Sequence, residues 1–289
     1  MPTTILTTTS STRPGSPSAG DAYFETDTKN YIIYDGANWR GYNSDGVSGW
    51  SGSNTYSLNF DGTDDYLTAA SIVTPTAQQG TISAWVKSTT TSFSPIFNIS
   101  SNTNGDTGYW TGLQFSGGSP GKLEFGHRPN AGDYILYTSA STYNDGNWHH
   151  VMVTTNGSAY KLFIDGAEDT GATASGTNNS NVVGGWIGDM AVKNSCNIGV
   201  QRRNADSTNG YFSGNIDEVA VWDSDQSSNI STIYNSGTPG NLLPLNPNHW
   251  WRMGDGAEGG SGSTVYDMSL GSVNATIVNQ ANFDNTTAP

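Results

Sequence analysis

The stretch Gly214–Trp222, GNIDEVAVW, decides the fold class of this chain. Ile216, Val219 and Val221 give it the apolar pattern of a buried strand, and yet an adjacent pair of carboxylates interrupts the pattern. Adjacent residues of a regular strand point to opposite faces of the sheet. Asp217 and its neighbour are therefore expected on opposite faces, where they would not act together as a catalytic pair.

The only convincing helical pattern in the chain follows this strand, over residues 223–235. Ser224 or Asp225 is expected to cap the helix, and Ile230 and Ile233 belong to one apolar stripe. A core strand followed by one short helix predicts an all-β protein with a single helical appendage.

The composition supports this fold class. The chain has 289 residues, of which 36 are glycine, and only 12% of them are charged. A helical protein of this length carries more Leu, Glu and Lys. Short apolar runs separated by Gly-containing turns recur from Tyr56 to Trp222, and residues 249–280 supply further strands. We therefore predict a two-sheet antiparallel jelly-roll sandwich with one short helix.

Charge and cysteine content exclude several classes of function. The net charge of −14 argues against binding nucleic acid, which needs clustered Lys and Arg. The single cysteine, Cys196, lies in a strand pattern and is expected to be a buried thiol. No apolar run approaches the roughly 20 residues of a membrane helix, so membrane insertion is not expected. The first residues lack the pattern of a signal peptide, and synthesis in the cytoplasm is expected.

Residues 1–50 are predicted to form a separate attachment module. Residues 1–20 are rich in Thr, Ser and Pro and are expected to be extended. Within residues 22–42, three short strands joined by polar turns predict a small β-meander. A module of this size buries too little surface to be stable alone. It is therefore expected to dock on another chain or to trimerise. A Gly- and Ser-rich linker over residues 43–54 leads into the second domain, residues 51–289.

Separated patterns in a fixed order carry a resemblance to a known family. They are Leu58–Leu67, Thr81–Lys87, Trp148–Val153, Lys161–Gly166 and Gly214–Trp222. Their order resembles the laminin-G-like, concanavalin A-like jelly-roll family, the lectin and glucanase fold, over roughly residues 54–240.

A Trp-Trp-Arg-Met segment, residues 250–253, is similar to one that often precedes such a domain. Here it follows the domain. The last strands are therefore expected to close the sheet from the C-terminal side, unless the ancestral array was cut at a different point.

The N-terminal residues carry a second resemblance. Residues 13–24, with Tyr31–Gly36 and Trp39, are similar to a short module at the start of many phage tail-fibre and virion-surface proteins. Together the two resemblances imply a bacteriophage protein on the virion surface, either a capsid decoration or a tail-fibre protein. They also imply that residues 1–50 bind other virion proteins and that the protein is a homo-oligomer, with a trimer the commonest arrangement.

The expected function is structural, with weak adhesion to cell-surface glycans and no catalysis. The alternative is a carbohydrate-active enzyme, or a secreted carbohydrate-binding adhesin, with the same sandwich. The histidines, at positions 127, 149, 150 and 249, do not suggest a Ser-His-Asp arrangement.

Acidic loops in the resembling family commonly hold calcium, and this implies one Ca²⁺ site formed by Asp64, Asp65 and Asp217. The other interpretation is that these acids cap turns and bond backbone N–H groups. Trp110 and Trp186 lie near Gly-rich stretches and are candidates for stacking on a sugar ring, although core packing is the usual role of tryptophan.

Glycan-facing loops are expected where the sequence is long, polar and rich in Asn. Three stretches meet that description, residues 102–108, 171–188 and 201–210.

Overall fold

The computed structural model divides the chain into two compact units. One unit comprises Met1–Ser53 with Leu243–Leu245, and the other comprises Asn54–Leu242 with Asn246–Pro289. Within the described residues, no helix is long and apolar enough to cross a membrane. The structure describes residues 6–9, 12–18, 21–25, 30–34, 39–43, 54–69, 72, 78–101, 109–190, 192–203, 207–254, 263–269, 273–279, 282–284 and 288–289. The predicted glycan-facing stretch at residues 102–108 lies outside them.

The first unit holds a four-stranded sheet. Strands β2 (Ala22–Glu25), β3 (Asn30–Tyr34) and β4 (Trp39–Asn43) pair antiparallel in chain order, and they form the meander that the sequence predicts. Strand β1 (Leu6–Thr8) pairs in parallel with β2. Part of the segment expected to be an extended arm is therefore an edge strand of this sheet.

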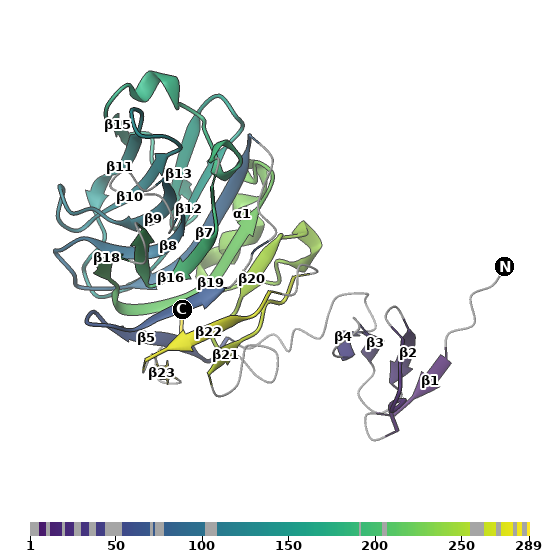
Figure 1. Ribbon diagram of the computed structural model, residues 1–289. Coiled ribbons are helices and arrows are strands. Elements are labelled where there is room, and N and C mark those ends of the chain that lie inside the picture. The colour runs from purple at the N-terminus through teal and green to yellow at the C-terminus, as the bar shows by residue number, and fades with distance from the viewer. Residues whose placement is uncertain are drawn as a thin grey trace. The chain divides into compact units, whose positions relative to one another are not determined.

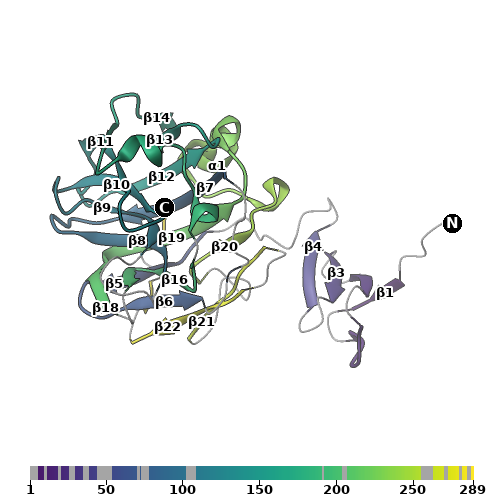
Figure 2. The ribbon, with the colours of Figure 1, turned by 45° about the horizontal axis from the view of Figure 1, so that its top comes forward.

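The second unit is a sandwich of two large sheets (Figures 1 and 2). The nine-stranded sheet contains, in spatial order, β15 (Thr173–Ser175), β11 (Ile135–Thr142), β10 (Lys122–Arg128), β9 (Trp110–Phe115), β8 (Ser94–Ser100), β16 (Ser195–Ile198), β6 (Tyr66–Ala69), β22 (Ala275–Val278) and β21 (Thr264–Val265).

The eight-stranded sheet contains, in spatial order, β14 (Ala167–Glu168), β13 (Tyr160–Ile164), β12 (Trp148–Thr155), β7 (Gly80–Lys87), β19 (Ser213–Trp222), β5 (Ser57–Asp61) and β23 (Asn282–Asp284), and β20 (His249–Trp251) pairs with β19 beside this path. A separate hairpin is formed by β17 (Val200–Arg203) and β18 (Ser207–Tyr211).

Side chains from the inner faces of both sheets form one hydrophobic core. Leu58, Ile82 and Val86 of the eight-stranded sheet are 0% exposed, as are Phe97 and Leu113 of the nine-stranded sheet. Burying each such side chain stabilises the fold by roughly 1.5–3 kcal/mol. The predicted all-β, two-sheet sandwich is confirmed, and the alternation of apolar residues along its strands is the reason that it forms.

Strand β19, which decides the fold class, contains a β-bulge. Its pairing with β7 skips from Asp217 to Ala220, and Glu218 has a left-handed backbone with φ 49°. A bulge inserts one extra residue and shifts the alternation of side chains. Ile216 and Val219 therefore both face the core, although three positions separate them.

The bulge corrects the expectation that the two adjacent carboxylates lie on opposite faces. Asp217 is opposite Trp85, and Glu218 accepts a hydrogen bond from Trp250 Nε1. Trp250 pairs with Ala220, which the bulge returns to the face that carries Trp85. Asp217 and Glu218 thus share the outer face, where they are only 0% and 2% exposed.

The helix after β19 is shorter than predicted. Helix α1 spans Ile230–Tyr234, and a single 3₁₀ turn, Ser227–Asn229, precedes it. Asp225 does not cap a long helix, because its Oδ1 accepts hydrogen bonds from Ser227 N and from Thr154 Oγ1 of β12. These bonds tie the chain to the sheet before the helix begins.

Helix α1 lies against the outer face of the eight-stranded sheet (Figure 1). Tyr234 of α1 stacks on Trp85 of β7, with ring centroids 5.7 Å apart and an interplanar angle of 18°. The other helical segments are 3₁₀ turns, at Asn179–Asn181, Ile187–Asp189, Asn235–Gly237 and Leu243–Leu245.

Strands from the C-terminal part of the chain join both sheets. β20 pairs with β19 and β23 pairs with β5 in one sheet, while β22 pairs with β6 in the other. The expectation that the last strands close the sheets from the C-terminal side is confirmed.

Candidate functional site

Three aspartates gather in the turn between β5 and β6, which we call the acid loop (Asp61, Asp64 and Asp65). Oxygens of their carboxylates lie within 4.8 Å of one another. Asp61 Oδ1 accepts hydrogen bonds from the backbone N–H groups of Thr63 and Asp64, at 2.7 and 3.4 Å. Asp65 Oδ2 accepts one from Asp61 N at 3.1 Å. The carboxylates thus fix the turn that carries them.

The acid loop also offers the donor chemistry of a calcium site. Ca²⁺ takes about 6–8 oxygen ligands, chiefly from carboxylates, carbonyls and water. Asp61 and Asp64 are exposed, while Asp65 is 4% exposed. A divalent cation would relieve the repulsion between the three like charges. The residues present therefore fit calcium, with Asp61 beside the predicted Asp64 and Asp65.

Asp217, the third predicted calcium ligand, lies away from the acid loop. The register pairs Asp61 with Ser213, so Asp217 lies four residues further along β19, about 13 Å at the usual rise of a strand. Its carboxylate is 0% exposed and accepts hydrogen bonds from Asn54 Nδ2 at 2.9 Å and from Glu218 N at 2.8 Å. The structure does not bring Asp217 together with Asp64 and Asp65.

The two tryptophans proposed as sugar platforms are buried. Trp110 is 7% exposed, and a Cβ at Gly126 would overlap its ring, so the indole lies over that glycine. Trp186 is 0% exposed and stacks on Phe125, with centroids 5.9 Å apart. The ring also lies against Gly80, where a Cβ would overlap it. Because both indoles are buried, neither is available to stack on a sugar ring.

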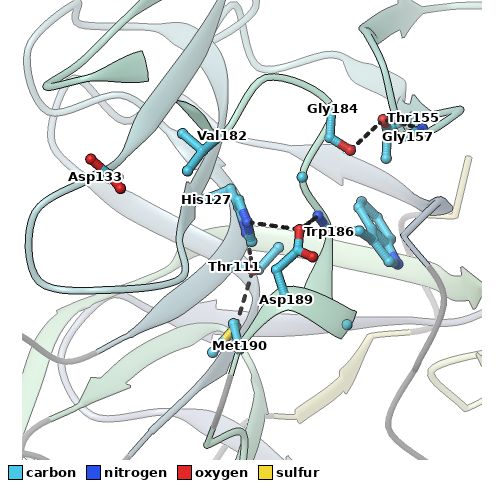
Figure 3. A network of polar contacts seen from close by, with 12 residues as sticks. Thr111, His127, Asp133, Thr155, Gly157, Val182, Gly184, Trp186, Asp189 and Met190 are labelled. Atoms are coloured by element: carbon cyan, nitrogen blue, oxygen red, sulfur yellow. Dashed lines mark hydrogen bonds and ion pairs between the residues drawn. The ribbon is translucent and has the colours of Figure 1, made fainter. Parts of the chain in front are cut away.

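A buried polar network joins β9 and β10 to the 3₁₀ turn at Ile187–Asp189 (Figure 3). His127 Nδ1 lies 2.8 Å from Thr111 Oγ1, and its Nε2 lies 3.7 Å from Asp189 Oδ2. Asp189 Oδ2 also accepts a hydrogen bond from Trp186 N at 2.8 Å. The network holds the turn against the end of the sheet.

This network has the connectivity of a hydroxyl–imidazole–carboxylate triad, but it is closed to substrate. Thr111 and His127 are each 0% exposed, and Thr111 Oγ1 also donates to Met190 Sδ at 3.2 Å. Burial lowers the pKa of His127, although the contact with Asp189 opposes this effect. A nucleophile must reach its substrate, so the role of the network is structural.

The nine-stranded sheet carries a single carboxylate in its strands, that of Glu124. Its Oε1 accepts a hydrogen bond from Gln114 Nε2, and its Oε2 accepts from Ser116 Oγ and Thr138 Oγ1. Glycoside hydrolysis uses a pair of carboxylates that flank the scissile bond. The strands of this sheet do not provide such a pair.

An exposed group of one carboxylate and three carboxamides lies where two loops meet. Asp133 Oδ2 accepts a hydrogen bond from Asn130 Nδ2 at 3.0 Å, and its Oδ1 accepts one from Asn181 Nδ2 at 3.4 Å. Asn178 also bonds to Asp133. The bonds from Asn130 and Asn178 lower the pKa of Asp133 most. We call these four residues the Asp133 ring.

Backbone contacts fix the Asp133 ring from both loops. Asn130 Oδ1 accepts hydrogen bonds from Gly132 N at 2.8 Å and from Asp133 N at 2.9 Å. Tyr134 N donates to Thr177 O at 3.0 Å, which ties the loop before β11 to the loop after β15. The ring therefore rests on a braced pair of loops at one end of the sandwich.

The members of the ring face solvent. Asn130, Asn178 and Asn181 are exposed, and Asp133 is partly buried. Sequence reasoning included the second loop among the glycan-facing stretches, but it missed Asp133 and Asn130. The available signal was the stretch Asn-Ala-Gly-Asp, residues 130–133, before a strand, a composition common to many turns.

The family of the chain follows from these strands and their order. Residues 61–229 match the model of the concanavalin A-like lectin/glucanases superfamily, and the chain belongs to this family. The search of curated proteins found no match.

The chain is also similar to several solved structures. The chain is similar to a putative carbohydrate binding protein from Bacteroides ovatus, with TM-score 0.50 and 16% identity over 93% of this chain and 70% of that one. It is also similar to the SAP-like pentraxin of Limulus polyphemus (TM-score 0.47, 20% identity, 63% and 82% covered). A third structure is the CBM40 module of the Ruminococcus gnavus IT-sialidase (TM-score 0.47, 16% identity, 59% and 93% covered). At 16% identity, the similarity to the Bacteroides ovatus protein shows the fold alone.

Proposed function

We propose that this chain is a non-enzymatic, glycan-binding protein of a bacteriophage virion surface, either a capsid decoration or a tail-fibre protein. The Asp133 ring carries the glycan-binding part of the proposal. Sugar hydroxyl groups donate and accept hydrogen bonds, and a carboxylate among carboxamides offers partners for both. Binding residues often lie on loops that a rigid scaffold positions, as these do.

The fold supports the same assignment. The Bacteroides ovatus protein is described as a putative carbohydrate binding protein. At 16% identity this similarity supports a lectin-like scaffold, while the ligand must come from this chain's own residues.

The N-terminal unit supports the virion part of the proposal. Residues 13–24 resemble the module at the start of phage tail-fibre and virion-surface proteins. Among the side chains of this sheet whose burial is described, Ile32 is buried, at 1% exposure. We propose that residues 1–50 gain stability by binding other virion proteins in a homo-oligomer such as a trimer.

Glycan-array binding of the purified protein tests the adhesive function. Asp133→Ala is expected to abolish the signal, whereas Asp145→Ala is expected to retain it. Asp145 is a matched control because it is an exposed aspartate bonded by a neighbouring amide, Asn147 Nδ2 at 2.9 Å. Release of reducing sugar from a bound glycan would contradict the non-enzymatic assignment and favour a carbohydrate-active enzyme.

Deletion of residues 1–53 tests the attachment role. The remaining sandwich is expected to fold and to bind the same glycans, but no longer to join the phage particle in a co-sedimentation assay. Incorporation of the truncated protein at the level of the full chain would refute the role assigned to the first unit.

A further inference from the structure

We propose that the Asp133 ring selects neutral saccharides that present two adjacent hydroxyl groups, and that it rejects acidic sugars. This proposal rests on the glycan-binding function above and names the ligand class of the same site.

The hydrogen-bonding groups of the ring match adjacent hydroxyls. A carboxylate has about four acceptor positions, and the three asparagines occupy up to three of those on Asp133. A sugar hydroxyl can donate to the remaining position. Each amide nitrogen carries two hydrogens, so Asn130 Nδ2 and Asn181 Nδ2 can each donate a second hydrogen to a hydroxyl oxygen. Two neighbouring hydroxyls would then be held by Asp133 and one amide together.

The donors and the acceptor are held in place before a ligand arrives. Both acceptor positions of Asn130 Oδ1 are used by the backbone N–H groups of Gly132 and Asp133, which fixes the amide so that its nitrogen points at the carboxylate. Asn178 Nδ2 reaches across to Gly132 O at 3.4 Å from the other loop. Preorganised groups lose little conformational freedom on binding, and affinity gains from this.

The charge around the ring disfavours acidic ligands. Asp133 is negatively charged at neutral pH, as an aspartate ordinarily is, and the amide bonds lower its pKa further. Residues 162–192 contain no Lys or Arg, and the whole chain carries a net charge of −14. The carboxylate of an acidic sugar would meet Asp133 with no cation from this loop to offset the repulsion.

The basic residue nearest to the ring in the sequence is committed to the backbone. Arg128 Nε donates to Asn130 O at 3.4 Å, and its Nη2 donates to Ala131 O at 3.1 Å. The guanidinium thus braces the loop that carries Asn130 and Asp133.

An apolar contact adjoins the ring in the sequence. Val183 follows Asn181 by two residues and is 45% exposed, one of two exposed large apolar side chains among the described residues. Sugar sites combine a few directed polar groups with an apolar surface for the C–H face of the ring. Val183 offers such a surface two residues after Asn181.

Calorimetric titration with matched sugar pairs tests the selectivity. Suitable pairs are glucose with glucuronic acid, galactose with galacturonic acid, and lactose with 3′-sialyllactose, because each pair differs by an acidic group. The neutral member of at least one pair is expected to bind about tenfold more tightly or better. Asp133→Asn is expected to lower the affinity for neutral sugars and to reduce the difference in affinity between the two members of a pair. Asp145→Asn is expected to change neither the affinity nor the difference.

Two results distinguish a failure of the proposed selectivity from a failure of the proposed glycan-binding function. Acidic sugars that bind as tightly as their neutral partners, with binding lost in Asn181→Ala, would overturn the selectivity and leave the glycan site in place. No binding to any sugar or array glycan would remove the adhesive function itself. Thermal unfolding of each variant, all altered at exposed or partly exposed positions, checks that lost binding is not lost folding.

Discussion

His149 shows how strongly one side chain depends on its neighbours. Its Nδ1 lies 2.7 Å from Asp165 Oδ2, and its Nε2 lies 3.1 Å from Asp145 Oδ1. The hydrogen bond that His149 donates to Asp165 raises the pKa of His149 most, against the opposing effect of burial. Bonds from Asn147, with smaller effects from His149, lower the pKa of Asp145 to about 2. Protonated His149 therefore links the loop before β12 to the turn after β13.

The raised pKa of His149 predicts a loss of stability at alkaline pH. A group whose folded pKa exceeds its unfolded value of about 6.5 stabilises the fold fully below that value. The stabilisation disappears as the pH rises through the folded pKa. Urea unfolding from about pH 6 to pH 9 should show this decline in the wild type and a flatter profile in His149→Gln. An unchanged profile in the variant would contradict the assignment.

His150, the next residue, predicts the opposite dependence. It is 0% exposed, and burial lowers its pKa to about 4. As the pH is lowered from about 6.5 to about 4, His150 takes up a proton in the unfolded chain but not in the folded chain. The free energy of unfolding therefore decreases over this interval by on the order of 3 kcal/mol. His150→Gln should reduce the slope of the unfolding free energy there, whatever its effect on stability at pH 7.

The acid loop predicts stabilisation by calcium. Ligand binding to the folded state raises the unfolding free energy by about 2.7 kcal/mol at a hundredfold excess over Kd. Differential scanning calorimetry should show a higher Tm with millimolar calcium than with chelator, and Asp64→Asn should abolish the difference. Asp217→Asn should leave it in place, because Asp217 lies outside the loop. If titration of calcium into the wild-type protein gives no heat of binding and calcium does not raise the Tm, the site is excluded.

At the scale of elements, the bulge in β19 contains one partner of a buried ion pair. Glu218 Oε1 accepts a hydrogen bond from Arg252 Nε at 3.1 Å, and the two side chains are 2% and 1% exposed. Arg252 Cζ also lies 5.5 Å from the centroid of the Trp250 ring. Strand β19 is thereby joined to the segment that follows β20.

Removing one partner of this pair predicts a large loss of stability. Arg252→Met would leave the Glu218 carboxylate buried without its cation, at a cost of roughly 3–5 kcal/mol. Glu218→Gln in the same chain should restore part of the loss, because the uncompensated charge is gone. Guanidinium denaturation of the single and double variants measures both steps. Equal stability of the two variants would show that the charge is not the cause.

The sequence predicts strands better than it predicts side-chain surroundings. Alternation along the strands is a local property, and it placed Ile216 and Val221 in the core. The bulge was missed, although the three-residue spacing from Ile216 to Val219 is its mark. The burial of Trp186 and the gathering of the Asp133 ring depend on loops distant in sequence, which no local pattern reports.

At the scale of the whole molecule, the C-terminal strands complete the sandwich. Val265 and Ala275 belong to the hydrophobic core, at 0% and 1% exposure. A chain that ends at Gly254 would lack both residues and would leave one edge of β5 and of β6 unpaired. Open edges and exposed core promote association between chains. The truncated protein is therefore expected to aggregate, and size-exclusion chromatography compares it with the full chain.

The positions of β5 and β6 in the sequence also determine when the sandwich can be completed during synthesis. They leave the ribosome first among the strands of the sandwich, yet their final partners, β23 and β22, emerge last. At a translation rate of about 5–20 residues per second, roughly 10 to 45 seconds pass between the synthesis of β5 and that of β23. The nascent sandwich therefore remains incomplete for that time, and one edge each of β5 and β6 stays unpaired until translation is nearly finished.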